Sequence, residues 1–135
     1  MTARNVIVVA SQTATSRELL EALRERAAQA PTRFTLIVPD APHDDGQLPP
    51  AQRLAEAVEH LTEHGLEVRG VLGDPNPVTA VREVWDAAGY DEIVVSTFPL
   101  AQSRWLPAGL PQRVADATGG PVAHVVARTE AHAAL

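Results

Sequence analysis

The sequence predicts a single-domain α/β protein with a doubly wound sheet of five parallel strands. Two observations carry this prediction: five short apolar runs rich in β-branched residues recur along the 135 residues, and a helix-forming segment lies between each run and the next. Strands that alternate with helices of this length are typical of parallel sheets with right-handed crossovers. Ligands of such sheets bind beyond the carboxyl ends of the strands, so functional residues are expected there.

The first half of the chain is predicted to contribute three strands and two helices. Continuous apolar or β-branched runs, which are expected of strands covered on both faces, lie at 5–10, 34–38 and 66–72. A Thr15-Ser16-Arg17-Glu18 capping box opens the first helix, which apolar residues at helical spacing extend to about Gln29. A second helix is predicted over 51–64, and Gly65 is placed to end it.

The second half is predicted to add two further helices and two strands. In chain order these are a helix over 77–88, a strand over 92–96, a helix over 110–118 and a strand over 122–127. Asn76 is expected to cap the first of these helices, with Pro77 in its first turn, where a missing N–H is harmless. Trp85 is placed on the apolar face of that helix and Gly89 at its end. The segment over 97–107 is predicted to be an extended loop.

Composition limits the function classes open to the chain. It contains no cysteine, and all eleven basic residues are arginine, so thiolate chemistry, cysteine-ligated metals and a Schiff-base or P-loop lysine are excluded. The net charge of -6 disfavours nucleic acid as a partner, because phosphate backbones are bound by clustered basic residues. No apolar run approaches the roughly 20 residues needed to cross a bilayer, and the amino terminus lacks a signal-peptide pattern. We therefore expect a cytoplasmic protein without membrane contact, with one domain over 1–128 and a tail over 129–135.

Three short motifs, together with the order of the elements, resemble the universal stress protein family across nearly the whole chain. They are Gly73-Asp74-Pro75 after the third strand, Asp91-Glu92-Ile93-Val94-Val95 in the fourth and Gly120-Pro121-Val122 at the fifth. The resemblance implies the strand order 3-2-1-4-5 of the adenine nucleotide alpha hydrolase-like folds. Many members of the family bind ATP through an acidic residue that ends the first strand and a G-x2-G-x9-G-[S/T] loop after the fourth. Other members lack that loop pattern and do not bind ATP.

The residues that this resemblance would assign to ATP are mostly replaced in the chain. The acidic position at the end of the first strand corresponds to Ser11, which is neutral and shorter. The loop pattern falls on Ser96, Pro99, Gly109 and Leu110, and only Gly109 matches it. Proline has no N–H to offer a phosphate, and leucine has no hydroxyl. We therefore expect no tightly bound ATP and no cofactor.

Arg104 and Trp105, in the loop before the last helix, offer a different ligand contact. Arg104 could replace the lost backbone donors by a bidentate contact to phosphate or carboxylate. The alternative is that Trp105 only covers the end of the sheet and Arg104 is a solvated surface residue. The candidate ligand-binding residues at this edge are Ser11, Thr13, Val38, Ser96, Thr97, Arg104 and Gly109.

Metal binding and covalent catalysis are not indicated. His60 and His64 are one helical turn apart, which suits metal ligation, but both are expected on a solvated face away from the apolar stripe. The consecutive residues His43-Asp44-Asp45 lie in a predicted loop and are poorly arranged to converge on one ion. No serine lies in a G-x-S-x-G nucleophile elbow. We expect no metal site and no enzymatic activity.

The last strand is expected to form an interface. It lies at the edge of the sheet in the implied order, and an exposed apolar edge favours pairing with a second copy. Members of the resembled family commonly dimerise through this strand, which predicts a homodimer through Val122, His124 and Val126. The leading functional hypothesis is a non-enzymatic regulatory or stress-associated binding domain. The alternative is a nucleotide-binding stress protein that takes ATP or AMP through an altered loop with Arg104.

Overall fold

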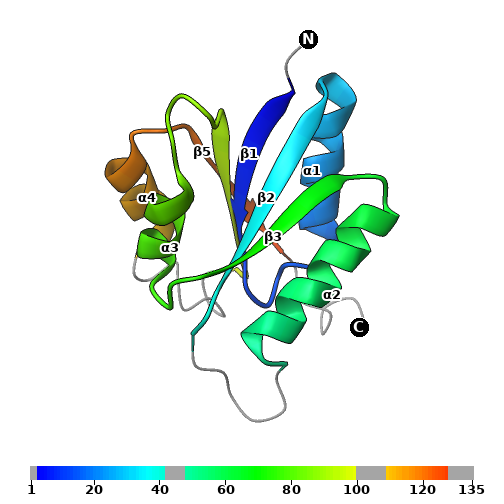
Figure 1. Ribbon diagram of the computed structural model, residues 1–135, viewed down its shortest axis with the longest axis horizontal. Helices are drawn as coiled ribbons and strands as arrows, with labels where there is room; N and C mark the ends of the chain where they lie inside the picture. The colour runs from blue at the N-terminus through cyan, green and yellow to red at the C-terminus, as the bar shows by residue number, and fades with distance from the viewer. Residues whose placement is uncertain (1–2, 42–47, 100–108, 128–135) are drawn as a thin grey trace.

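A computed structural model describes residues 3–41, 48–99 and 109–127, and it confirms the predicted α/β architecture (Figure 1). One sheet of parallel strands has the order β3-β2-β1-β4-β5. The strands are β1 (Arg4–Val9), β2 (Thr32–Pro39), β3 (Glu67–Gly73), β4 (Glu92–Thr97) and β5 (Val122–Val126). The helices are α1 (Arg17–Gln29), α2 (Pro50–Glu63), α3 (Pro77–Val84) and α4 (Leu110–Thr118). None of these helices is long and apolar enough to cross a bilayer.

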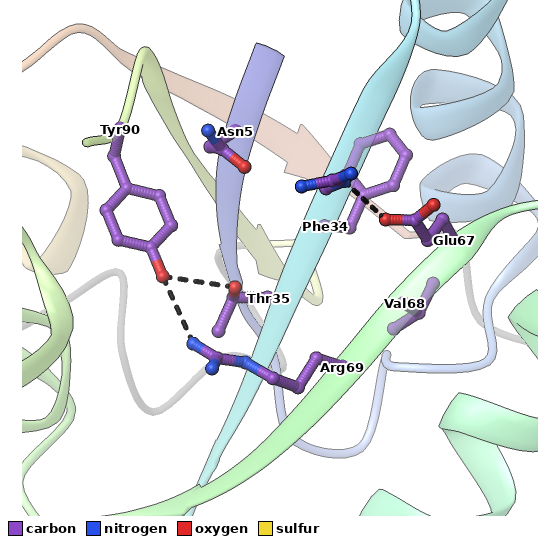
Figure 2. A pocket seen from close by; sticks show the side chains of 8 residues that line it. Asn5, Phe34, Thr35, Glu67, Val68, Arg69 and Tyr90 are labelled. Carbon is purple, nitrogen blue, oxygen red and sulfur yellow. Dashed lines mark hydrogen bonds and ion pairs between the residues drawn. The ribbon is translucent and has the colours of Figure 1, made fainter. Parts of the chain in front are cut away.

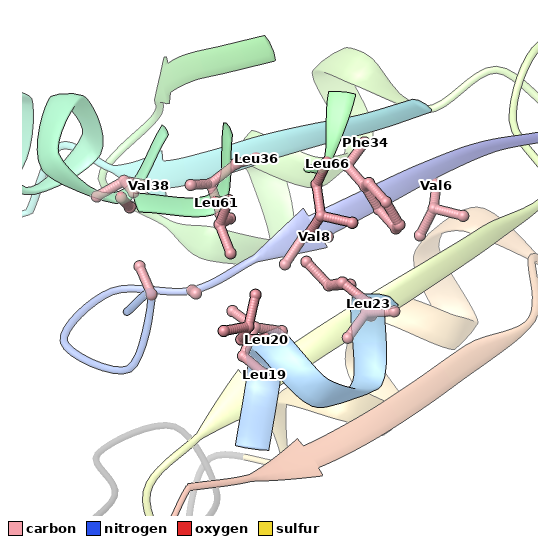
Figure 3. Packing of buried hydrophobic residues seen from close by; sticks show 14 residues of the cluster. Val6, Val8, Leu19, Leu20, Leu23, Phe34, Leu36, Val38, Leu61 and Leu66 are labelled. Atoms are coloured by element: carbon pink, nitrogen blue, oxygen red, sulfur yellow. The ribbon is translucent and has the colours of Figure 1, made fainter. Parts of the chain in front are cut away.

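Helices cover both faces of the sheet, because the central strands are apolar on both sides. α1 and α2 pack on one face, and α3 and α4 pack on the other (Figure 1). The largest buried side chains of the first core are Leu19, Leu23, Phe34, Leu36 and Leu61 (Figure 3). The second core contains, among others, Ile7, Val9, Ile37, Val81, Leu110 and Val114. Burial on both faces is what the continuous apolar runs predicted.

A charged pair ties the end of α1 to the start of β4. The Arg26 guanidinium donates to both carboxylate oxygens of Glu92, with N···O distances of 2.8 and 2.9 Å. The two side chains are only 19% and 16% exposed, and the hydrogen bond to Glu92 is the main cause that raises the pKa of Arg26. A bidentate pair with so little solvent contact fixes the helix against the sheet.

The first helix begins one residue later than its sequence pattern suggests. Ser16, and not Thr15, is the N-cap, because the Ser16 hydroxyl accepts from the backbone N–H of Leu19 at 3.1 Å. The predicted capping box is therefore wrong. The preceding residues form a turn in which the Ser16 N–H donates to the Thr13 carbonyl at 3.0 Å, and Ser16 leaves this turn in the extended conformation that a cap adopts.

The third helix also differs from the prediction, because it ends at Val84 rather than near Ala88. Trp85 leaves the helix in an extended conformation, and Asp86 Oδ1 accepts from the Ala88 N–H at 3.0 Å. An aspartate that satisfies nearby backbone donors competes with helical hydrogen bonding. Gly89 consequently closes a turn on Asp86 rather than the helix. The other boundaries agree with the predicted ones to within one or two residues.

We predict that Gly73→Ala destabilises the fold by about 1–3 kcal/mol, the range typical of overpacked sites. α3 packs on the end of β3 at Gly73, where an added Cβ would lie 2.7 Å from Ala80 Cβ and 2.9 Å from Ile37 Cγ2. Neither neighbour can give way without shifting its own element. Gly89→Ala is the matched control, because its added Cβ meets Asp86 at an ordinary 3.4 Å. Urea unfolding measures both variants, and equal midpoints would contradict the close approach.

Candidate functional site

The predicted ligand residues lie at the carboxyl edge of the sheet. β1 stands between β2 and β4, and the strand order reverses at this point, which is where ligands bind in open α/β sheets. Ser11 follows β1, whereas Ser96 and Thr97 end β4. Val38 lies near the end of β2, and its side chain is fully buried in the core. The structure therefore places these residues together, although Val38 can offer only its backbone.

Thr13 and Ser96 form a buried pair of hydroxyls. Their oxygen atoms are 2.6 Å apart, and the two residues are 3% and 0% exposed. Thr13 comes from the turn after β1 and Ser96 from β4, so the bond links this turn to the end of the neighbouring strand. The two hydroxyls satisfy each other and hold the turn in place.

Arg53 is a polar residue at this edge that the sequence analysis missed. It lies near the start of α2, and its guanidinium donates to Ser11 Oγ at 2.8 Å and to the Leu48 carbonyl at 2.9 Å. Burial lowers the pKa of Arg53, yet an arginine stays charged at physiological pH. In the family that the chain resembles, an acidic residue is expected at the position of Ser11. In this chain the positive charge of Arg53 lies beside that position instead. No motif marks Arg53, and its place at the start of a helix that follows a strand is the one signal available.

Thr97, at the end of β4, contacts His124, in the middle of the neighbouring β5. Their Oγ1 and Nε2 atoms are 2.7 Å apart, and the Thr97 hydroxyl donates to the Phe98 carbonyl at 2.8 Å. Because the hydroxyl hydrogen is used in this way, the Thr97 oxygen accepts from His124, and Nε2 carries the proton. Burial lowers the pKa of His124 below its ordinary 6.5, which favours the neutral ring.

The last helix contributes one glycine to the same edge. Gly109 precedes α4 as its N-cap, in the left-handed conformation with a φ of 70° that glycine adopts readily. The side chain of Leu110 is buried in the second core. Arg104 and Trp105 lie outside the described residues. The predicted ligand residues other than Arg104 thus meet at one edge, and their roles stay predictions.

The histidines of α2 differ in part from the prediction. His60 is half-buried, and its Nε2 is shielded from solvent without a hydrogen-bond partner in the described part of the chain. The His64 ring lies 4.6 Å from the His60 ring between centroids. His64 is exposed, so a solvated face is right for His64 and wrong for the half-buried His60. Within the described ranges, no group of three metal-ligating side chains occurs. His43-Asp44-Asp45 lies outside those ranges.

Comparisons with known proteins identify the fold. No protein-family model matches the chain, and no curated protein matches it. Among solved structures, the chain is similar to a universal stress protein in complex with cAMP, with 22% identity, 94% of this chain and 99% of that chain covered, and a TM-score of 0.64. Two structures from Archaeoglobus fulgidus are also similar: a universal stress protein (14% identity, coverage 93% and 95%, TM-score 0.63) and one in complex with dAMP (15%, 93% and 99%, 0.64). The chain has the fold of the universal stress proteins, which confirms the resemblance at the level of the fold.

Thr13→Val is expected to destabilise the protein by about 1–3 kcal/mol, because it leaves the buried Ser96 hydroxyl without its partner. Ser96→Ala should have a similar effect for the same reason. The double variant should lose less than the sum of the single variants, because it removes both polar groups. Urea denaturation of the four proteins measures this coupling. Strict additivity would show that the two hydroxyls do not depend on each other.

Proposed function

We propose that this chain is a non-enzymatic regulatory domain that binds an adenine nucleotide with a single phosphate at the carboxyl edge of β1 and β4. The observation that carries the proposal is the Arg53 guanidinium beside Ser11. It is a positioned cation at the place where ligands of this sheet type bind. Ser11 and Leu48 use part of its five N–H donors, and the others can point to a phosphate.

Two of the similar solved structures support the choice of nucleotide. One holds cAMP and the other dAMP, and each of those molecules carries one phosphate. At 22% and 15% identity these likenesses establish the fold. The ligand is proposed from this parallel together with the charge of Arg53.

The same edge is poorly suited to a triphosphate. Leu110 stands where the family pattern has a hydroxyl, and its side chain is buried in the core. Pro99 has no N–H to donate. Asp40 and Asp74 follow β2 and β3 at this edge, and their carboxylates repel a polyphosphate. A single phosphate beside β1 and Arg53 carries less negative charge than a triphosphate and therefore meets less of that repulsion.

A binding role fits the polar groups better than catalysis does. A nucleophilic hydroxyl needs a base that accepts its proton. His124 instead donates to Thr97, and the Thr97 hydrogen goes to the Phe98 carbonyl, so this pair is not poised for proton abstraction. The hydroxyls of Thr13 and Ser96 hydrogen-bond to each other rather than to a base.

We also propose that two copies pair through β5. Among the described strands, β4 is the only neighbour of β5 in the sheet, and Val126 is 40% exposed on β5. Pairing would satisfy the open backbone groups of the edge. A two-fold axis at the middle residue, His124, would bring Val122 of each copy opposite Val126 of the other.

AMP or cAMP at about 100 times its Kd should raise the thermal midpoint by roughly 5–10 °C, because a ligand that binds only the folded state stabilises it. ATP should give a smaller rise at the same concentration. Arg53→Gln should abolish the effect, whereas Arg82→Gln, an exposed arginine on α3, should keep it. Arg104→Ala tests the loop contact expected from the sequence. A midpoint that no nucleotide moves, or that Arg53→Gln leaves responsive, would contradict the proposed site.

Val126→Glu should convert a dimer into a monomer at micromolar concentration, because a charge on the edge strand opposes strand pairing. Leu72→Glu is the matched control: Leu72 is 42% exposed on β3, the opposite edge of the sheet, against 40% for Val126. Sedimentation equilibrium measures the mass of each variant. Dissociation by Leu72→Glu alone would place the interface on β3, and a monomeric wild type would exclude this dimer.

A further inference from the structure

A polar hollow lies at the other end of the sheet from the candidate site. It has a volume of about 330 Å³ and opens at the amino ends of β1, β2 and β3 (Figure 2). Its polar side chains are Asn5, Arg33, Thr35, Glu67, Arg69 and Tyr90. The side chains on the strands lie in two rows across the sheet. Asn5, Arg33 and Glu67 are in register in one row, and Thr35 and Arg69 are in register in the other.

The hollow is open because α3 stops short of the amino ends of the strands. Trp85, directly after α3, turns away toward Gly120, where an added Cβ would lie only 2.5 Å from the indole ring. Tyr90 stacks beside Trp85, with ring centroids 6.3 Å apart, and so forms one wall. No helix of the described chain therefore covers this part of the α3 face.

The strands carry polar residues in this uncovered area and apolar residues under α3. Ile37 and Val71 pair in register and pack in the second core under α3. Two residues earlier, on the same face of the same strands, stand the polar residues Thr35 and Arg69. Residues two apart share a face of a strand, so the change from apolar to polar marks where the helix cover ends.

Arg69 is a positive charge without a close carboxylate among the described residues. The neighbouring Arg33 forms an ion pair with Glu67 at 2.7 Å, which leaves Arg69 as the uncompensated charge among the residues that line the hollow. Its guanidinium is oriented by a hydrogen bond of 3.4 Å from Nη2 to Tyr90 Oη, seen in Figure 2. A positive hollow on a chain of net charge -6 is a local departure from the overall electrostatics.

The hydroxyls add a second donor. Tyr90 Oη and Thr35 Oγ1 are 3.2 Å apart and share one hydrogen bond. Each hydroxyl has one hydrogen, and Tyr90 already accepts from Arg69, so one hydroxyl hydrogen has no acceptor among the described residues. A guanidinium and a hydroxyl donor side by side are the groups that bind an oxyanion.

We propose that this hollow is a second binding site, distinct from the carboxyl edge, for a small molecule that carries a carboxylate or phosphate group. Arg69 contacts the oxyanion, Tyr90 orients the guanidinium, and the Tyr90–Thr35 pair donates its remaining hydroxyl hydrogen. The site does not depend on the proposed nucleotide function, because it is built from different residues at the opposite end of the strands.

The single tyrosine of the chain provides a direct reporter. Protein labelled with 3-fluorotyrosine gives one ¹⁹F signal, from Tyr90, which is followed during titration with inorganic phosphate in one arm and acetate in the other, at constant ionic strength set with chloride. We expect a saturable shift in the millimolar range in at least one arm. The arm that responds more strongly identifies the preferred oxyanion.

Arg69→Gln should weaken the response roughly tenfold or more, the loss typical of one charge-assisted hydrogen bond. Arg69→Lys keeps the charge and should retain a weaker response, which also tests the site if Arg69→Gln does not fold. Arg53→Gln is the control for the carboxyl edge and should leave the response unchanged. The proposal is overturned if neither anion gives a saturable shift, if Arg69→Gln responds like the wild type, or if Arg53→Gln removes the response.

Discussion

The burial of β1 and β4 on both faces is the constraint on which the rest of the structure depends. From Val6 to Val9 and from Ile93 to Val95 the side chains have no exposed surface. Polar groups on these strands are therefore confined to the ends, with Asn5 and Glu92 at one edge and Ser96 at the other. This separation leaves two polar edges with an apolar centre between them, and at the carboxyl edge the hydroxyls of the strand ends lie beside the charge of Arg53.

Much of the fold could be predicted from the sequence, because the periodic apolar pattern and the tertiary packing agree. α4 has the predicted bounds, and Asn76 caps α3 as expected, with its side chain accepting from the N–H of Val78. The end of α3 was not predictable in the same way. It depends on the side chain of Asp86, which accepts from a nearby backbone N–H, and on the close packing of Trp85 against Gly120. The packing of Trp85 against Gly120 joins distant parts of the chain.

The candidate site was predictable in its location but not in its pairing. Strand order brings Ser11, Thr13 and Ser96 to one edge, and the family resemblance implies that order. The sequence does not show that the hydroxyls of Thr13 and Ser96, which are separated by 83 positions, form a hydrogen bond. Arg53 was missed because it is the single arginine of α2, and nothing in the sequence pattern shows that its long side chain reaches across to Ser11.

The strand order also has a consequence for synthesis of the chain. β1, β2 and β3 can pair in the order in which they emerge, whereas β1 meets its other neighbour, β4, only after Glu92 is available. Until then the nascent domain exposes a long apolar edge along β1, the kind of surface on which unfinished chains aggregate. Because of this strand order, the β1 edge needs protection during synthesis, by chaperones or by rapid elongation.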